Sequence, residues 1–206
     1  MPISFPVSVG TQAYRFGPKK RVYYPQVSQM RNQQLQHLIN QSIIHQTQGL
    51  ISLQVGNMPS TVVEMLGFYE IKNNQRQVLS LTQSNYTYHD KAAHGMTYIR
   101  SLTFDLKQGR RCDLKDLFKP GSDYVTRLSE LILAQIKERK IDLLSEFTTI
   151  SPNQEFYVAD KTLVIYFQLY DLTPYVFGFP MFPISVYDIQ DIINEDGPLG
   201  RMATND

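Results

Sequence analysis

The stretch between residues 156 and 184 constrains the fold more than any other part of the sequence. It contains two runs rich in β-branched and aromatic residues, 156–159 and 162–168, separated by the polar pair Asp160-Lys161. Two such runs around a two-residue polar turn are typical of a β-hairpin. The aromatic segment that follows is interrupted by proline and glycine and ends in another apolar run, so it predicts an ordered loop that returns to the same sheet.

Two other segments follow the period of an α-helix. Apolar residues at helical spacing predict a first helix over residues 29–48. A second helix is expected to begin after Ser122 or Asp123, since either side chain can cap a helix, and to run to about Lys140. Its apolar residues fall on one face, which is the pattern of a helix packed on a core.

The other strands are expected earlier in the chain, at residues 21–27, 65–72, 78–82 and 97–105. Asn73 and Asn74 are expected to form the turn between the second and third of these strands, because asparagine is common in tight turns. Residues 85–95 are polar and aromatic, and we expect them to form a loop.

The strands and helices are grouped rather than strictly alternating. This order predicts an α+β fold with antiparallel sheets, two main helices packed on one side and a short C-terminal helix, expected over residues 187–194. We expect an extended N-terminal arm over residues 1–20 and two α+β subdomains, over residues 21–109 and 110–196. Gly197-Pro198 is expected to end the C-terminal helix, and residues 197–206 to form a tail that is frayed from Arg201 on.

Composition excludes several classes of partner. Twenty Lys and Arg residues against 19 Asp and Glu give a net charge of +1, which builds no field for nucleic acid or an acidic membrane. No apolar run approaches the roughly 18 residues that a membrane span needs, and no secretory signal is visible at the N-terminus. We therefore expect a soluble, cytoplasmic protein, and an extracytoplasmic one only if a leader has been removed.

Cys112 is the only cysteine, so no disulfide can form within the chain. Its neighbours Arg110 and Arg111 could lower the pKa of the thiol if they approach it. The favoured interpretation is a lone structural thiol, because Cys112 lies in what looks like a turn.

Short motifs along the chain follow one another in a characteristic order. They include Val22-Tyr23-Tyr24-Pro25-Gln26-Val27, Gly67-Phe68-Tyr69-Glu70-Ile71, Ala92-Ala93-His94-Gly95-Met96, Leu114-Lys115-Asp116-Leu117-Phe118 and residues 156–184. Their order and spacing resemble the family called domain of unknown function 3298, preceded by its usual upstream partner, domain 4163. The resemblance covers roughly residues 20–190.

The resemblance implies a non-catalytic α+β unit that binds or senses a ligand. Some members of the family are extracytoplasmic regions of membrane-anchored anti-sigma factors that sense lysozyme, and others lie beside a peptidoglycan deacetylase domain. It therefore implies a sensor-like module linked to the bacterial cell envelope, with a lysozyme-like protein or a peptidoglycan fragment as its partner. We expect no catalytic residue, no metal and no cofactor.

Aromatic residues mark the surface that would bind such a partner. The candidate binding residues are Tyr88, His94, Tyr170, Tyr175 and Phe177, on loops at residues 86–95 and 172–182. Tyrosine supplies a large, rigid contact area at low entropic cost. The last three belong to an aromatic stripe that also includes Tyr166 and Phe182. The alternative is that these rings pack within a half-buried sheet, since aromatic residues are enriched in strands.

Two further sites and two further functions stay open. His89, Asp90 and His94 could ligate zinc, although their spacing is not that of a zincin helix and no Glu-bearing His motif accompanies them. Asp171 and Asp188 could act as acid and base in a hydrolase of glycan or peptidoglycan. A structural assembly protein, for instance of a sporulating cell, is the third hypothesis beside the favoured binding module.

Overall fold

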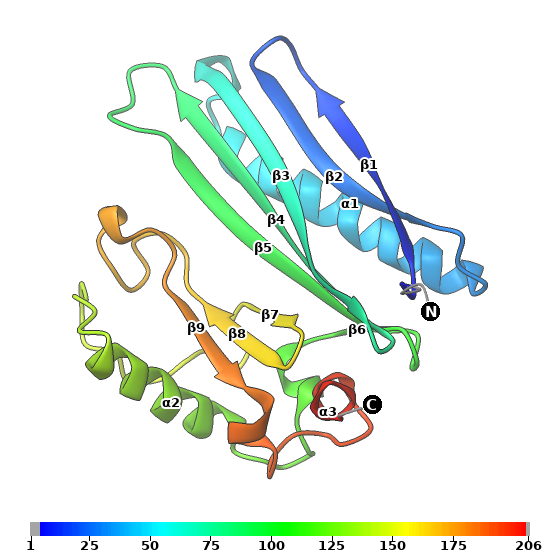
Figure 1. The fold of residues 1–206 in the computed structure, drawn as a ribbon. Coiled ribbons are helices and arrows are strands. Elements are labelled where there is room, and N and C mark those ends of the chain that lie inside the picture. The colour runs from blue at the N-terminus through cyan, green and yellow to red at the C-terminus, as the bar shows by residue number, and fades with distance from the viewer. Residues whose placement is uncertain (1–4, 205–206) are drawn as a thin grey trace.

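The computed structural model describes residues 5–204 and contains two sheets (Figure 1). The larger has six strands in the order β1-β2-β3-β4-β5-β6, and the smaller has three in the order β7-β8-β9. The strands are β1 (Ser8–Arg15), β2 (Lys20–Ser28), β3 (Val62–Gln75), β4 (Val78–His89), β5 (Met96–Asp105), β6 (Arg110–Cys112), β7 (Phe156–Ala159), β8 (Thr162–Tyr166) and β9 (Met181–Ser185). All neighbouring strands are antiparallel except β2 and β3, so the predicted α+β class is confirmed.

Three α-helices accompany the sheets: α1 (Gln33–Val55), α2 (Tyr124–Glu138) and α3 (Pro198–Ala203). Four short 3₁₀ turns, η1 (Pro59–Thr61), η2 (Leu114–Leu117), η3 (Tyr175–Phe177) and η4 (Val186–Ile189), lie between the strands and helices. Within the described part of the chain, no helix is both long and apolar enough to cross a membrane.

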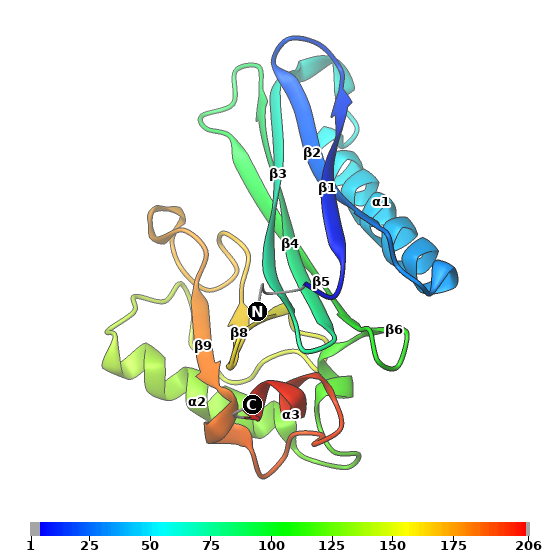
Figure 2. The same cartoon turned by 45° about the vertical axis from the view of Figure 1, so that its right-hand side comes forward.

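Each long helix covers one face of its own sheet. The apolar face of α1 packs on the six-stranded sheet in one core cluster: Leu35, Ile39, Ile43, Leu79, Leu81, Leu102 and Phe104. The apolar face of α2 packs on the three-stranded sheet in another: Leu128, Ile132, Ile136, Val158, Leu163 and Ile165. Figure 2 shows the two helices on opposite sides of the molecule, with the sheets between them.

Strand β5 joins the two sheets. Strand β6 pairs with it only at Thr103–Asp105, so the rest of this edge has no neighbouring strand. At Ile99 the buried side chain of Gln168 takes the place of a strand: its amide oxygen accepts from the Ile99 N–H at 3.1 Å. Its amide nitrogen donates to the Ile99 carbonyl at 2.6 Å. The backbone N–H of Val158 on β7 donates to Ser80 on β4, which adds a second polar contact between the sheets.

The short C-terminal helix is confirmed, but it lies later in the chain than residues 187–194. That segment begins with η4 and continues as turns, whereas Gly197 precedes the first residue of α3. The predicted role of Gly197-Pro198 as a stop is wrong, since proline fits the first position of a helix, where no N–H partner is needed. Residues 198–203 are therefore packed helix rather than frayed tail, and residues 205–206 lie outside the described residues.

Helix α1 begins and ends later than residues 29–48. The side chain of Asn32 accepts from the Leu35 N–H at 3.0 Å and so caps a helix that begins at Gln33, four residues beyond the expected start, while Gln29 has a positive φ of 60°. The helix then continues to Val55, where Gly56 ends it. Other polar residues near each end of the helix could also serve as caps, so the sequence alone did not identify which residues end it.

The turn between β3 and β4 is formed by Arg76 and Gln77, both with positive φ, and not by Asn73 and Asn74. A register shift between Ile71 and Asn73 buries the Asn73 side chain, which donates to the Val78 carbonyl at 2.7 Å. Asparagine bonds backbone groups in strand bulges as readily as in turns, so the turn prediction was wrong.

Two other segments expected to be irregular are strands. Residues 85–89 continue β4, so the predicted loop is shortened to residues 90–95. Within the expected N-terminal arm, residues 8–15 form β1, which pairs antiparallel with β2 along its whole length. Residues 1–4 lie outside the described residues.

A buried ion pair ties α3 to the larger sheet. Arg201 donates to the Asp105 carboxylate at 2.7 Å, and the Asp105 side chain is 0% exposed. Removing one partner of a buried pair leaves an uncompensated charge. We expect Arg201→Gln to lower the free energy of unfolding by about 3 kcal/mol in urea denaturation. Glu70→Gln, which removes the pair between Lys72 and a carboxylate that is 70% exposed, should cost less than about 1 kcal/mol; equal losses would contradict the assignment.

The Gln168 amide offers a second test of this architecture. Gln168→Met keeps the side-chain volume but leaves the Ile99 N–H and carbonyl without their partners. We expect a loss of about 2 kcal/mol and faster hydrogen exchange at the Ile99 amide. The control is Gln48→Met, which removes only a surface contact to Tyr14 at 3.4 Å. Unchanged exchange at Ile99 would show that Gln168 does not close this edge.

Candidate functional site

The loop after β4 and the loop between β8 and β9 meet in an aromatic cluster of His94, Tyr170 and Tyr175. The His94 and Tyr175 rings are 4.4 Å apart, and the Tyr170 and Tyr175 rings 5.5 Å. Both His94 Nδ1 and the Tyr175 hydroxyl approach the carbonyl of Gly95, at 2.9 and 3.2 Å. Because a carbonyl only accepts, His94 Nδ1 carries the proton in a neutral ring, and Nε2 accepts from Tyr170 at 3.2 Å.

The cluster is open to solvent and is flanked by an apolar tip. The Tyr170 side chain is 44% exposed, and beside it on η3 Val176 is 93% and Phe177 41% exposed. Tyr170 also has a positive φ of 68°, which costs energy for a bulky residue. A turn closed by the Gln168 carbonyl, which accepts from the Asp171 N–H at 3.2 Å, holds this conformation. Such strain is commonly found where a side chain must be presented to a partner.

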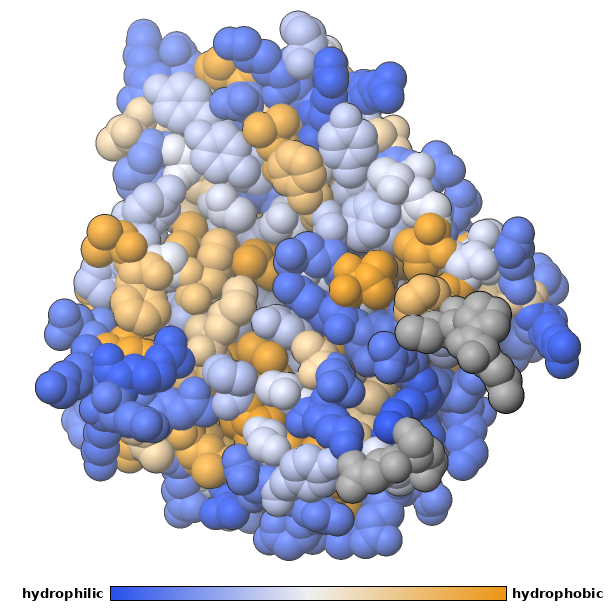
Figure 3. Space-filling model, in the orientation of Figure 1, coloured by the Kyte–Doolittle hydropathy of each residue, from blue (hydrophilic) through white to orange (hydrophobic). Residues whose placement is uncertain are grey.

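Tyr86 and Tyr88 lie on β4 rather than on a loop, next to the cluster. A Cβ atom at Gly95 would lie 2.2 Å from the Tyr86 ring, so glycine is needed for this ring to pack there. Side chains alternate along a strand, which puts Tyr88 on the same face as Tyr86. On the neighbouring β3, Phe68 is 52% exposed and stacks on Tyr23 at 6.0 Å. Figure 3 views the molecule in the orientation of Figure 1, and side chains of intermediate hydropathy cross its upper part, over the larger sheet.

The structure therefore brings three of the five predicted binding residues into direct contact. Phe177 ends the turn that begins at Tyr175, and Tyr88 lies on the adjoining strand without a contact to the cluster. Two other members of the predicted aromatic stripe, Tyr166 and Phe182, are 0% exposed and belong to the core. They point inward because residues of β8 and β9 alternate between the two faces of a sheet that is covered on both sides.

His89 is occupied by structural contacts. Its Nδ1 lies 2.7 Å from the Thr61 hydroxyl, and its Nε2 lies 2.8 Å from the Gln54 carbonyl. Both ring nitrogens thus join β4 to the end of α1 and to η1. Across residues 5–204, no group of three or more His, Cys, Asp or Glu side chains is arranged to hold a metal ion.

Asp171 and Asp188 lie at opposite ends of the β8–β9 pair. Asp171 follows the end at Tyr166, where its carboxylate accepts from the Gln168 N–H at 3.1 Å, and Asp188 follows the other end on η4. The five paired residues alone span about 13 Å at about 3.3 Å per step. Glycosidases hold their two carboxyl groups about 5–9.5 Å apart, so this pair does not form such a site.

Cys112 is a buried thiol. Burial raises the pKa of the Cys112 thiol to about 11, and the opposing effect of Arg110 is smaller. Arg110 is itself engaged with Asp116 at 3.1 Å. The interpretation as a structural thiol fits this environment, because the reactive thiolate is nearly absent at neutral pH.

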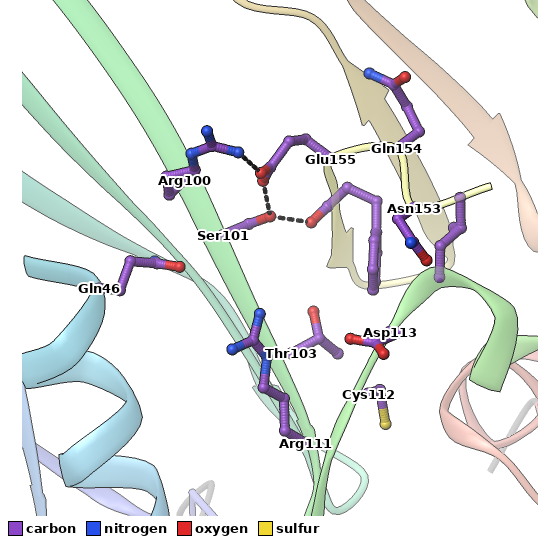
Figure 4. A pocket seen from close by; sticks show the side chains of 12 residues that line it. Gln46, Arg100, Ser101, Thr103, Arg111, Cys112, Asp113, Asn153, Gln154 and Glu155 are labelled. Atoms are coloured by element: carbon purple, nitrogen blue, oxygen red, sulfur yellow. Dashed lines mark hydrogen bonds and ion pairs between the residues drawn. The ribbon is translucent and has the colours of Figure 1, made fainter. Parts of the chain in front are cut away.

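A second polar site was not predicted from the sequence. The buried Tyr166 hydroxyl donates to the Glu155 carboxylate at 2.8 Å, and Glu155 also forms an ion pair with Arg100. Burial and the nearby Glu155 raise the pKa of Tyr166 well above its ordinary value. Arg100 and Glu155 line a groove on the edge of β5 (Figure 4). The available signal was Arg100, a charged residue in the middle of a strand whose other residues are uncharged as far as Phe104.

Comparison with known proteins agrees with the predicted family. Residues 115–187 match the family model described as Protein of unknown function (DUF3298). The fold is similar to a crystal structure of a DUF3298 family member from Bacteroides fragilis (TM-score 0.72, 13% identity, 98% of this chain and 99% of that chain). It is also similar to a DUF3298 family protein from Pseudomonas aeruginosa (TM-score 0.67, 14% identity, 92% of this chain and 95% of that chain).

A curated protein matches over part of its length. The chain is 25% identical over 136 residues, 62% of its length, to the peptidoglycan-N-acetylmuramic acid deacetylase PdaC of Bacillus subtilis (strain 168). The match spans 28% of that protein. The resemblance to domain 3298 is thus confirmed, whereas the upstream domain 4163 stays a prediction.

The environment of Cys112 predicts its reactivity. With a thiol pKa of about 11, roughly one molecule in several thousand carries a thiolate at pH 7.5. We expect an aromatic disulfide reagent to leave the native protein unmodified over an hour and to release one equivalent of chromophore once guanidinium has unfolded it. Stoichiometric reaction of the native protein within minutes would contradict this environment.

Proposed function

We propose that this protein is a non-enzymatic binding module linked to the bacterial cell envelope, and that its aromatic cluster binds a peptidoglycan-derived glycan. The observation that carries this proposal is the contact among His94, Tyr170 and Tyr175, which come from loops about 80 residues apart. Two chain segments are ordered against each other to present exposed rings. Core packing alone gives no reason for this exposure.

The chemistry of the cluster suits a sugar. A pyranose ring has an apolar C–H face, which packs on an aromatic ring, and a rim of hydroxyl groups. Tyr170 supplies both an exposed ring and a hydroxyl group, so it can pack on the face and bond the rim. Small-molecule sites are commonly built this way, from aromatic walls with a few fixed polar groups.

The match to PdaC supports the same ligand class. The name of that enzyme says that it acts on the N-acetylmuramic acid of peptidoglycan. A module that binds the glycan would serve such an enzyme without performing chemistry itself. In this chain, Asp171 and Asp188 lie too far apart to act together as the acid and base of a glycosidase, so this pair of carboxylates does not support a hydrolase.

A protein ligand is the second candidate, because of the tip of η3. Val176 is almost fully exposed and Phe177 is next to it. Exposed apolar side chains at the end of a rigid turn can act as anchors in a protein interface. The family resemblance makes lysozyme the natural protein probe.

Calorimetric titration with soluble muropeptides and, separately, with lysozyme tests both candidates. For muropeptides we expect Tyr170→Ala and Tyr175→Ala each to weaken binding at least tenfold, because each removes a ring of the cluster. Tyr187→Ala is the matched control, since Tyr187 is 46% exposed and lies on η4, at the other end of β9.

Val176→Ser separates the two ligands. It should leave muropeptide binding unchanged and weaken lysozyme binding, because only a protein surface reaches the apolar tip. Failure of the unsubstituted protein to bind either probe at millimolar concentration would refute the proposed function.

A further inference from the structure

A groove runs along the free edge of β5, between α1 and the segment that leads into β7. Two adjoining cavities of about 210 and 340 Å³ form it, and they share Gln46, Arg100 and Arg111 in their walls. Figure 4 shows these side chains around the first cavity, with residues 153–155 on the far side. The aromatic cluster contributes no residue to either cavity, so the two sites are separate.

Only one of the two guanidinium groups is neutralised within the protein. Arg100 is paired with Glu155, whose carboxylate also accepts from the Tyr166 hydroxyl at 2.8 Å and from Ser101 at 3.4 Å. Arg111 is exposed, and its side chain has no hydrogen bond or ion pair to any of residues 5–204. Figure 4 shows its guanidinium pointing into the groove, toward Arg100. Arg111 is therefore the guanidinium of the groove that has no ion pair within the described residues.

The wall on the α1 side begins with the polar Ser42, His45 and Gln46 and becomes apolar, with room, one turn later. Leu53 is 49% exposed there, Leu50 lies one turn earlier, and a Cβ atom on Gly49 would meet nothing within 4 Å. On the opposite side the groove carries the carboxylates of Asp113 and Glu155. These acidic groups repel a doubly charged ligand such as phosphate more strongly than a singly charged one, whose charge can pair with Arg111.

We infer that the groove binds a small monoanionic carboxylate with an apolar body. The planar guanidinium of Arg111 pairs with a carboxylate through two parallel hydrogen bonds. The apolar body packs over Leu50 and Leu53 in the space that Gly49 leaves open. Two sources share this chemistry, a short acyl chain and the C-terminus of a short apolar peptide.

Isothermal titration with hexanoate and with N-acetyl-dialanine distinguishes these sources. We expect one of them to bind, its uncharged amide to bind at least tenfold more weakly, and binding to weaken as sodium chloride is raised. Tighter binding of hexanoate would assign the site to acyl chains, and tighter binding of N-acetyl-dialanine would assign it to peptide termini. Equal or tighter binding of inorganic phosphate, or no binding of either carboxylate at millimolar concentration, would overturn the inference.

Variants of the groove test the assignment without affecting the aromatic cluster. Arg111→Gln should weaken carboxylate binding at least tenfold, and Arg31→Gln, a change at an exposed arginine outside the groove, should leave it unchanged. Gly49→Leu fills the open space from a position where leucine also favours the helix, so it should abolish binding in a folded protein. Undiminished binding to both groove variants would place the ligand elsewhere.

Discussion

The free edge of β5 is the constraint on which the rest of the structure depends. Strand β6 pairs with only three residues of β5, so the exposed backbone groups before them need other partners. The amide of Gln168 supplies them at Ile99, and the Ser101 hydroxyl bonds the Phe156 carbonyl. Hydrogen bonds are directional, so these contacts at the strand edge fix how the two sheets are placed against each other. Apolar contacts alone would allow the sheets to slide.

Both candidate sites follow from this joint. At one end of β5, the Gln168 contact brings the residues that follow it beside Gly95, where Tyr170 and Tyr175 meet His94. Further along the strand, the same docking sets Glu155 against Arg100 and leaves a groove toward α1. The two sites are therefore consequences of one polar interface, although they are built from different side chains.

The elements predicted correctly from the sequence are those that a short stretch of residues specifies and that no neighbouring residue contradicts. The hairpin around Asp160 and the cap of α2 at Asp123 were recognised because nothing nearby competes with them. Asn73 and Gly197 were misassigned because asparagine serves bulges as well as turns, and glycine precedes helices as well as following them. For the cluster, an exposed tyrosine and the buried Tyr166 look alike until it is known that β5 covers Tyr166. The groove was missed because its arginines are neighbours only in space.

Arg100 and Arg111 illustrate why a binding group is distinguished by its partners and not by its charge. A ligand that took Arg100 would have to displace Glu155, leaving that carboxylate against the buried Tyr166 hydroxyl without its cation. The Glu155 side chain is only 24% exposed, so losing its cation would cost stability, and here it would also loosen the joint at β5. The Arg111 side chain can bind an anion without losing a hydrogen bond or ion pair within residues 5–204. Binding of an anion at Arg111 therefore costs the protein no stability. For this reason Arg111, and not Arg100, is the residue through which the groove binds an anion.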